Sequence, residues 1–438
     1  MSLLNFFKKN LNDIIRLGFK EFLRKLKIFF KIFIITIPIY LASFFFVLVI
    51  RIISPIIKIR VQRIISQRIG HFIAETELHL CEKSLKKKNN KIQIDLFYYD
   101  LFVSNKKIDE MIKSNLIIVP KIIFKPIHDI NFLINKILII VGIERDINNF
   151  IVPRPKCADR DVKNLLIKCS QKLNLISADY IEGEKFLNKL GIINKKFVCL
   201  AVRDDNYLKI SQPRGDWKYH NFRNGNINDY LLAAEELTNR GYHVIRMGKY
   251  AKEKLKTNNP LIIDYSFSNY RNDFLDVYLG GNCKFCISTG FGFDAIPYVF
   301  RKPIAYVYTP IGYLFSFTKN SVAIFKNYYS ENKKRYLNIN EIFNEDLAFV
   351  YNGEILKKKK IILKENSPEE IKDLAIEMDN RLNNNFKLSI NEIELQNKFW
   401  AKYKYLIKEK NEELKHGKIN MKICNKFLKD NKKILIDV

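Results

Sequence analysis

The sequence predicts an α/β protein with parallel sheets, because apolar strands alternate with helices through short loops between residues 196 and 310. Such alternation implies right-handed βαβ units. A chain of 438 residues is long enough for two α/β domains, each with its own core. An uncharged apolar stretch, residues 32–50, precedes these domains. We therefore expect two Rossmann-like domains facing across a cleft, with an N-terminal apolar helical membrane anchor.

The expected domains follow one another along the chain. They are membrane-anchor helices at 1–60, an N-terminal Rossmann-like acceptor domain at 61–180, a C-terminal Rossmann-like nucleotide-binding domain at 181–365, and C-terminal helices with a basic tail at 366–438. The helices of the last segment are expected to cross back in part to the first domain. In the N-terminal domain, residues 68–83 are expected to form a loop and a helix. A strand at 92–98, a helix at 104–114 and a strand at 116–119 are expected to follow.

The C-terminal domain carries the clearest pattern. Its expected strands are 197–202, 242–245, 261–263, 285–287 and 304–307, and its expected helices are 227–241, 273–279 and 293–300. Arg203, Arg246 and the loop 288–292 each come directly after a strand. Ligands bind at the carboxyl ends of strands in parallel sheets, so these residues are expected to meet at one site. Near the C-terminus, Ser367 followed by Pro368 and acidic residues predicts a helix start.

The loop Ser288-Thr-Gly-Phe-Gly-Phe-Asp294 is suited to a diphosphate. Its two glycines allow close approach of the backbone, and a helix N-terminus just beyond offers free N–H groups. The alternative is a tight strand-to-helix turn in which Asp294 caps the helix. The loop matches neither common phosphate-binding glycine pattern. The arginines that end neighbouring strands favour phosphate, because guanidinium groups bind phosphate oxygens in pairs.

Several segments together resemble a family of bacterial glycosyltransferases of the two-Rossmann, GT-B type, which is associated with surface-polysaccharide synthesis. The segments are Val202-Arg-Asp-Asp-Asn-Tyr207, Tyr219-His-Asn-Phe-Arg-Asn224, Gly241-Tyr-His-Val-Ile-Arg-Met-Gly248 and Ile287-Ser-Thr-Gly-Phe-Gly-Phe-Asp-Ala-Ile-Pro297. The resemblance is dense over residues 180–310 and extends weakly to 68–72 and to the region of Phe399 and Trp400. The segment around Arg203 also resembles fucosyltransferases that use GDP-fucose, although Ala201 stands where those enzymes have a histidine.

This resemblance implies a nucleotide sugar as substrate, with no separate cofactor, and a glycan or lipid-linked acceptor. The donor site is then expected to comprise Arg203, Asp204, Tyr207, His220, Arg223, Arg246, Gly248, Ser288, Thr289, Gly290, Gly292 and Asp294. Glycosyl transfer also needs a base for the acceptor hydroxyl. His71 in the first loop of the N-terminal domain is the candidate, with Glu75 one helical turn later as alternative base or orienting partner. A loop histidine bonded to backbone is the other interpretation of His71.

No metal site is expected. Asp159 and Asp161 have the D-x-D spacing used for metals in another glycosyltransferase fold, but they directly precede a helical stretch, which favours capping. The chain has seven cysteines, and some lie within apolar strands, so reduced and buried thiols in the cytosol are expected. Cys283 and Cys286 have C-x-x-C spacing without a second pair for zinc. We interpret them as core residues.

The net charge of +29 raises the question of a nucleic-acid ligand. The lysines are spread along the chain without a nucleic-acid-binding signature, so a basic face against anionic membrane lipid is favoured. The apolar stretch 32–50 is long enough to span a bilayer. Spanning would place the nucleotide-binding domain outside the cell, and Pro38 and Pro55 allow an interfacial arrangement instead. We expect attachment to the bacterial inner membrane with the catalytic domains in the cytoplasm, and spanning stays an alternative.

The sequence thus predicts a membrane-attached glycosyltransferase that moves sugar from a nucleotide-sugar donor to a surface-polysaccharide or lipid-linked glycan precursor. It does not specify the donor sugar, the linkage or the stereochemical outcome. A non-catalytic nucleotide- or glycan-binding subunit of a polysaccharide assembly complex is the alternative from another class. A basic nucleic-acid-binding protein is the third interpretation.

Overall fold

The computed structural model describes residues 19–86, 92–143, 147–154, 160–213, 215–314, 320–412 and 417–436. The chain forms two compact units, which it enters alternately. Unit 1 comprises Met1–Ile65, Lys87–Leu101 and Leu116–Arg154, and unit 2 comprises Ser66–Lys86, Phe102–Asn115 and Pro155–Val438. This division into two units does not test the domain ranges expected from the sequence, and those ranges stay a prediction.

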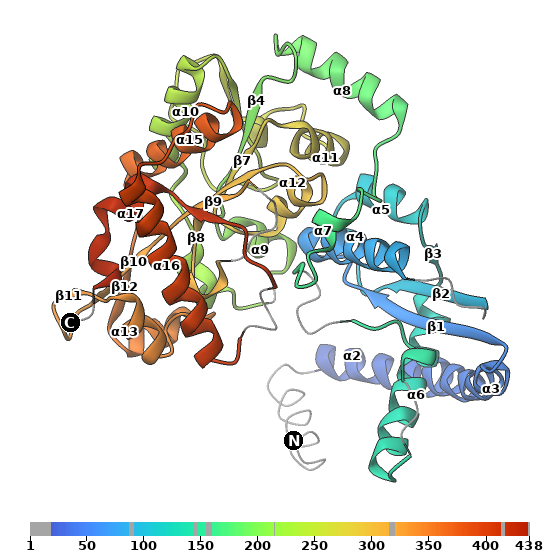
Figure 1. Cartoon of the computed structure of the whole chain (residues 1–438). Coiled ribbons are helices and arrows are strands. Elements are labelled where there is room, and N and C mark those ends of the chain that lie inside the picture. The colour runs from blue at the N-terminus through green and yellow to red at the C-terminus, as the bar shows by residue number, and fades with distance from the viewer. Residues whose placement is uncertain are drawn as a thin grey trace. The chain divides into compact units, whose positions relative to one another are not determined.

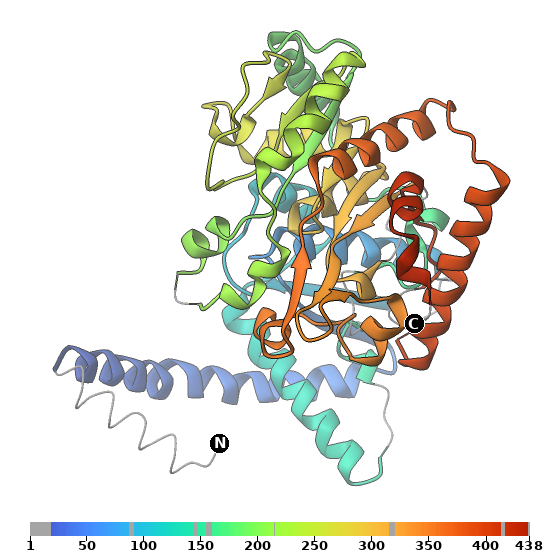
Figure 2. The same ribbon diagram turned by 90° about the vertical axis from the view of Figure 1, so that its left-hand side faces the viewer.

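The described part of unit 1 is built on a short parallel sheet. Its strands β1 (Ile57–Ile64), β2 (Ile92–Tyr99) and β3 (Ile117–Ile118) pair in that order. Its helical elements are α2 (Phe19–Phe30), the π-helix η1 (Lys31–Thr36), α3 (Ile37–Ile53), α6 (Lys121–Ile140) and η2 (Ile147–Asn149). Figure 2 shows α2, η1 and α3 in one line, with α6 crossing them. Neither β1 nor α6 was expected from the sequence, and β1 begins inside the range assigned to the anchor.

One face of α3 belongs to the core of unit 1. Val47 and Ile50 of α3 are buried in the same cluster as Val61 of β1, Tyr98 of β2 and Ile127 of α6. Beside this cluster, Arg60 and Asp95 form a buried bidentate ion pair across β1 and β2, at 2.7 and 2.9 Å. Among the described residues, one helical stretch, Phe33–Ile53, has the length and composition to cross a membrane, properties that buried core helices share.

The described part of unit 2 contains a seven-stranded parallel sheet, which confirms the expected α/β class. Its strands, in order across the sheet, are β13 (Lys422–Ile423), β9 (Val322–Phe325), β8 (Ile304–Tyr308), β7 (Cys286–Ser288), β4 (Phe197–Ala201), β5 (His243–Arg246) and β6 (Ile262–Ile263). The five strands expected between residues 197 and 307 are all present, with ends shifted by at most one residue. The strands β9 and β13 extend the sheet at one edge.

Helices cover both faces of this sheet (Figure 1). On one face lie α10 (Leu231–Asn239) and α15 (Pro368–Leu382), and on the other lie α11 (Asp273–Asn282) and α12 (Ala295–Val299). The helix α4 (Ile69–Leu85) packs against α12. The predicted start of α15 is confirmed, because the Ser367 side chain accepts a hydrogen bond from the Glu370 N–H in a capping box.

Further elements complete unit 2. They are α5 (Lys106–Lys113), α7 (Leu165–Lys168), α8 (Ser177–Lys189), α9 (Asn206–Ser211), η3 (Lys218–Arg223), η4 (Ile227–Tyr230), η5 (Tyr265–Phe267), η6 (Gly292–Asp294), η7 (Ile311–Tyr313), β10 (Asn327–Ser330), β11 (Arg335–Tyr336), α13 (Ile339–Asn344), α14 (Gly353–Lys358), β12 (Ile361–Lys364), α16 (Ile390–Glu409), α17 (Asn425–Asp430) and η9 (Lys432–Leu435). The strands β10, β11 and β12 form a small antiparallel sheet.

The strand order creates a reversal point beside β4. From β4 the chain moves outward through β5 to β6, and it then returns to place β7 on the opposite side of β4. In open parallel sheets, such a reversal leaves a crevice at the carboxyl ends of the two strands, and ligands bind there. The segments that follow β4 and β7 are those that begin with Val202 and Thr289.

Candidate active site

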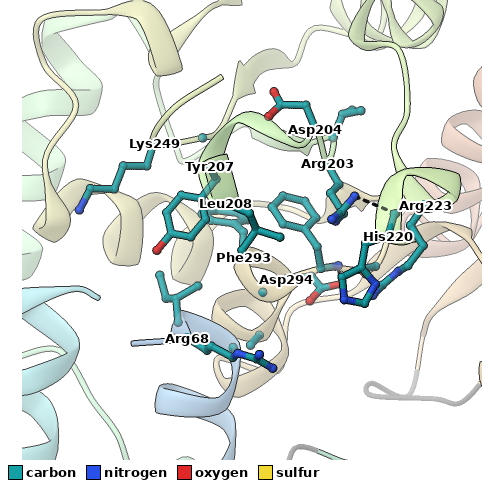
Figure 3. Close-up of a pocket in the computed structure, with 18 of the residues that line it drawn as sticks. Arg68, Arg203, Asp204, Tyr207, Leu208, His220, Arg223, Lys249, Phe293 and Asp294 are labelled. Atoms are coloured by element: carbon teal, nitrogen blue, oxygen red, sulfur yellow. Dashed lines mark hydrogen bonds between the residues drawn. The ribbon is translucent and has the colours of Figure 1, made fainter. Parts of the chain in front are cut away.

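A pocket of about 400 Å³ opens at the carboxyl ends of β4, β5, β7 and β8. This volume lies within the range of small-molecule sites. The described residues that line it all belong to unit 2. The expected site residues among them are His71, Arg203, Asp204, Tyr207, His220, Arg223, Arg246, Gly248, Gly290, Gly292 and Asp294. Figure 3 shows Arg203, His220 and Arg223 grouped at one end, with Tyr207 and Lys249 toward the other.

Arg203 is a buried cation at the end of β4. Its backbone N–H donates to Thr289 Oγ1 at 2.9 Å, which fixes the end of β4 to the loop after β7. Its guanidinium donates to the His220 carbonyl at 3.2 Å and to the Asn224 side-chain oxygen. Burial, and then the nearby Arg223, lower the pKa of Arg203 to about 10. The group therefore remains charged at neutral pH, and the nearby Asp204 and Asp205 only partly offset its desolvation.

Arg68 and Arg223 lie around the same end of the pocket. Arg223 Nη2 donates to the Gly290 carbonyl at 2.6 Å. Burial lowers the pKa of His220 to about 4, and the next causes are Arg223, Arg203 and Arg68 in that order. All three guanidinium groups therefore act on one imidazole, which stays neutral at pH 7. In the part of the chain that the structure describes, none of the three arginines forms an ion pair with a carboxylate.

The loop after β7 is held by its own side chains. Ser288 is fully buried, and its hydroxyl accepts a hydrogen bond from the Gly290 N–H and donates one to Asp294. The Asp294 carboxylate also accepts from the Phe291 N–H at 3.2 Å, which is the capping role that the sequence left open. Two loop amides are thus already bonded, and α12 is a short helix. Ser288 and Thr289 brace the loop behind the pocket, and the arginines supply the positive charge.

Two glycines in this loop meet different structural demands. Gly290 has φ +75°, and a Cβ at this position would lie 2.5 Å from the Tyr308 ring. Gly292 instead contacts the start of α4, because a Cβ on Gly70 would lie 3.0 Å from Gly292 Cα. The close approach expected for a ligand at Gly292 is therefore made by a helix. The contact between Gly70 and Gly292 places the first turn of α4, which carries His71, directly against the loop.

His71 is paired with Glu75 on α4. Its Nδ1 lies 2.6 Å from Glu75 Oε1, an i,i+4 contact along one helix face. His71 lines the pocket, whereas Glu75 lies behind it and outside the lining. An ionised carboxylate accepts a hydrogen bond from Nδ1–H, which leaves Nε2 as the ring nitrogen able to accept a proton. The arrangement can hold an imidazole in the tautomer that a general base requires.

Arg246 has a partner that the sequence did not reveal. Its side chain is 2% exposed, and Nη1 donates to Asp264 Oδ1 at 3.0 Å and to the Glu253 carbonyl at 3.0 Å. Asp264 also accepts from the Leu255 N–H, so the pair fastens the segment after β5. Arg246 reaches the pocket wall with its charge already balanced by a carboxylate.

The other predicted donor residues also organise loops. Asp204 accepts hydrogen bonds from the backbone N–H groups of Asn206 and Lys252, both at 2.9 Å. The Tyr207 ring is stacked on Tyr250, with centroids 5.9 Å apart. Gly248 adopts φ +153°, in the region that favours glycine. Together these contacts shape the aromatic end of the pocket, opposite the arginines.

Sequence reasoning missed part of the pocket wall. Arg160 donates to the Tyr351 hydroxyl at 2.7 Å, and its guanidinium lies 4.4 Å from the centre of the Tyr313 ring. These residues and Tyr308 all line the pocket. They come from distant segments, and no local motif connects them. The one sequence signal was Arg68, which belongs to the quoted 68–72 segment but was not assigned to the site.

The remaining metal and thiol candidates have structural contacts. Asp161 accepts hydrogen bonds from the Leu165 and Leu166 N–H groups at 2.6 and 2.8 Å, as a capping residue would, and Asp159 lies outside the described residues. Cys283 and Cys286 are buried, and burial raises the pKa of the Cys286 thiol well above its ordinary value. In the described ranges, no group of three or more His, Cys, Asp or Glu side chains is arranged to hold a metal ion.

No family model matches the chain, and no curated protein matches its sequence. Two solved glycosyltransferase structures are similar to it in part. A glycosyl transferase family 9 protein from Veillonella parvula shares 10% identity at a TM-score of 0.39, over 73% of this chain and 97% of that one. The E. coli ADP-heptose LPS heptosyltransferase II shares 11% identity at a TM-score of 0.34, over 60% of this chain and 90% of that one. At these values neither likeness assigns an activity.

Proposed function

We propose that the protein is a glycosyltransferase that moves a sugar from a nucleotide-sugar donor to a glycan or lipid-linked acceptor. One observation carries this proposal: Arg68, Arg203 and Arg223 surround one end of a pocket at the sheet's reversal point, and no described carboxylate pairs with them. A cluster of uncompensated cations in a partly desolvated pocket favours a ligand with two or more negative charges.

A nucleoside diphosphate fits this demand. Its phosphates can accept paired hydrogen bonds from guanidinium forks, and glycosyl transfer leaves additional charge on the departing diphosphate. Arg203 is the best placed of the three, because its guanidinium is buried, and burial and Arg223 lower its pKa. A bound anion offsets the free-energy cost of burying the Arg203 charge. We propose that the arginines provide the charge neutralisation that a divalent ion supplies in other transferases, and that no separate cofactor takes part.

His71 is the proposed general base. With Nδ1 directed at Glu75, the imidazole can take the acceptor hydroxyl proton on Nε2. Because α4 packs on the loop through Gly70 and Gly292, the base and the arginines share one wall of the pocket. The proposed acceptor is a surface-polysaccharide or lipid-linked precursor, and the proposed place of reaction is the cytoplasmic membrane face. Its support is the family resemblance of residues 180–310 and the apolar helix Phe33–Ile53.

The test is to incubate the purified protein with a panel of nucleotide sugars, measuring thermal shift and then nucleotide release. We expect nucleoside diphosphates and one nucleotide sugar to stabilise the wild type, and nucleoside monophosphates to stabilise it less. Arg203→Ala should lose the shift, whereas Arg335→Ala, which removes a guanidinium from a surface pair with Glu341, should keep it.

If binding occurs but no acceptor extract promotes nucleotide release, the non-catalytic subunit is the better description. If no nucleotide shifts the melting temperature, the donor assignment is wrong.

A further inference from the structure

Unit 1 carries an apolar surface formed by two helices, and it is separate from the candidate active site. On α3, Leu41, Phe45, Leu48 and Ile52 are exposed at i, i+4, i+7 and i+11, which places them on one face. On α6, the last turn and the residues after it, Ile137, Ile139, Ile140, Val141 and Ile143, are all exposed. Ile52 is 75% exposed and Ile140 is 83% exposed. Soluble surfaces rarely present so many large apolar side chains together.

The two exposed regions lie on the same side of unit 1. The buried residues of α3, Ser43, Val47 and Ile50, are on the helix face opposite to the exposed one, and that face packs toward β1 and β2. Figure 1 shows these strands on one side of α3 and the free end of α6 on the other. Figure 2 shows α6 crossing α3 and continuing past it. The exposed face of α3 and the apolar end of α6 therefore form one surface, which we call the two-helix surface.

Polar contacts fix the angle between these helices. Near one end of α3, the Tyr40 hydroxyl donates to Asp129 at 2.7 Å, and Lys125 also bonds to Asp129. Near the other end, Arg51 donates to the side-chain oxygens of Asn131 at 3.1 Å and Asn135 at 3.2 Å. These contacts join α3 to α6 through polar side chains and leave the outward faces apolar.

We propose that unit 1 docks on an anionic lipid membrane through the two-helix surface, with α3 lying in the plane of the membrane interface and the end of α6 inserted among the lipids. The sequence predicted a membrane anchor over residues 1–60, without α6, and left its orientation open. The packing decides the orientation, because crossing the bilayer would require α3 to leave the core that contains Val47 and Ile50. A sheet with open edges and the Arg60–Asp95 ion pair cannot follow it into hydrocarbon.

Charge and shape favour lipid as the occupant. Between residues 19 and 58 the sequence has seven Lys or Arg and one acidic residue, and none of these charges falls within 32–50. Lys136 lies near the inserted end of α6, with its ammonium 4.9 Å from the centre of the Phe132 ring. Basic residues beside an apolar face are the pattern of helices that bind anionic membrane interfaces. A projecting helix end is convex, and fluid lipid can surround it without a complementary groove.

This proposal deepens the membrane setting of the proposed function. Vesicle binding by the full-length protein tests it without using activity, so its failure is distinguishable from a failure of glycosyl transfer. The vesicles contain phosphatidylglycerol and phosphatidylethanolamine in one arm and phosphatidylcholine alone in the other. We expect stronger binding in the anionic arm, and Ile52→Glu and Ile140→Glu should each weaken it about tenfold or more. Ile390→Glu is the matched control, because Ile390 is 77% exposed on α16 of unit 2. It should bind as the wild type does.

Orientation is tested by labelling from outside sealed vesicles with a membrane-impermeant maleimide. Lys27→Cys and Arg63→Cys place thiols before and after α3, and labelling of the unsubstituted protein is subtracted. In-plane docking predicts that both thiols react. Protection of one of them would overturn the in-plane orientation in favour of spanning.

Vesicle binding that is unchanged in both glutamate variants would overturn the proposal that the two-helix surface docks on a membrane. If those variants instead abolish a concentration-dependent dimer, a second copy of the chain is the occupant.

Discussion

The ends of β4 and β5 differ in how their arginines are balanced. The strands are parallel neighbours, with Leu200 in register with Arg246, and Arg203 follows β4 two residues after its end. Both arginines are buried. The Arg246 guanidinium donates to the Asp264 carboxylate, whereas the Arg203 guanidinium donates to uncharged oxygens of His220 and Asn224. Strand position therefore indicates where a ligand can bind, and an unbalanced charge indicates which residue can bind it.

The two histidines of the pocket differ in the same way. His71 contacts the carboxylate of Glu75, which orients the ring. His220 is partly desolvated beside arginines, which disfavours a proton. The first environment suits proton transfer, and the second keeps a neutral imidazole beside the proposed phosphate site.

The largest effect is expected for His71→Ala. Loss of a positioned base lowers turnover by about 10²- to 10⁴-fold, while donor affinity stays near that of the wild type. Turnover and melting temperature should be measured for His71→Ala and Glu75→Gln side by side. A histidine with only a structural role would lower the melting temperature and leave the rate per folded molecule unchanged. If Glu75→Gln alone is inactive, the carboxylate is the base.

Arg246→Met should mainly reduce stability. It leaves Asp264 without its cationic partner, and breaking a buried ion pair costs about 3–5 kcal/mol. Asp264 retains 20% side-chain exposure, so the lower end of that range is expected. Denaturant unfolding measures the loss, and the double variant Arg246→Met/Asp264→Asn should recover part of it. Reduced donor affinity in a variant of normal stability would show instead that Arg246 binds the ligand.

Arg203→Ala and Arg223→Ala should mainly reduce donor affinity. Each removes a charge-assisted hydrogen bond of about 1.5–3 kcal/mol, which corresponds to roughly ten- to a hundredfold in Kd. Stability should change little, because neither guanidinium is paired with a described carboxylate. Titration calorimetry with the preferred nucleotide sugar measures the change, with Arg335→Ala as control. Unchanged affinity in a folded double variant would remove the basis of the phosphate assignment.

The smallest effect concerns His220 and pH. Its pKa is about 4 in the folded protein and near 6.5 when unperturbed, so between these values the unfolded chain binds a proton that the folded chain does not. Unfolding is then favoured as pH falls, and stability is lost from pH 6.5 downward. Melting curves from pH 7.5 to 4.5 should show the wild type losing more stability than His220→Asn. Parallel curves for the two proteins would show that the pKa of His220 is not lowered by the fold.

Much of the larger sheet could be predicted from the sequence, because the strands of residues 197–307 are short apolar runs bounded by helix signals. Other elements have no such boundary signals in their sequences. The strand β1 alternates basic and apolar residues directly after an apolar helix, so its sequence has the pattern of a charged flank. The helix α6 contains Pro126, which usually ends a helix, and its apolar surface resembles that of α3.

The candidate site was predictable where residues follow strands, as Arg203 and Gly290 do. Pairing across the fold could not be inferred. The partner of Arg246 is Asp264, 18 positions later. The need for glycine at position 292 comes from its close contact with Gly70, on a helix far away in the sequence. Ser288 and Thr289 were expected to face the ligand, yet their hydroxyls bond to the loop and to Arg203. The functional roles assigned to all these residues stay predictions until they are measured.

The last strand of the large sheet has a consequence for how the protein is made. β13 contributes only Lys422 and Ile423, but it pairs with β9, whose residues Val322–Phe325 are buried. During synthesis about a hundred residues must emerge between β9 and β13, and until then β9 is an exposed apolar edge. Such edges pair readily with other chains. The newly made protein should therefore depend on chaperones until its C-terminal segment is released, and cells that lack them should accumulate it as aggregate.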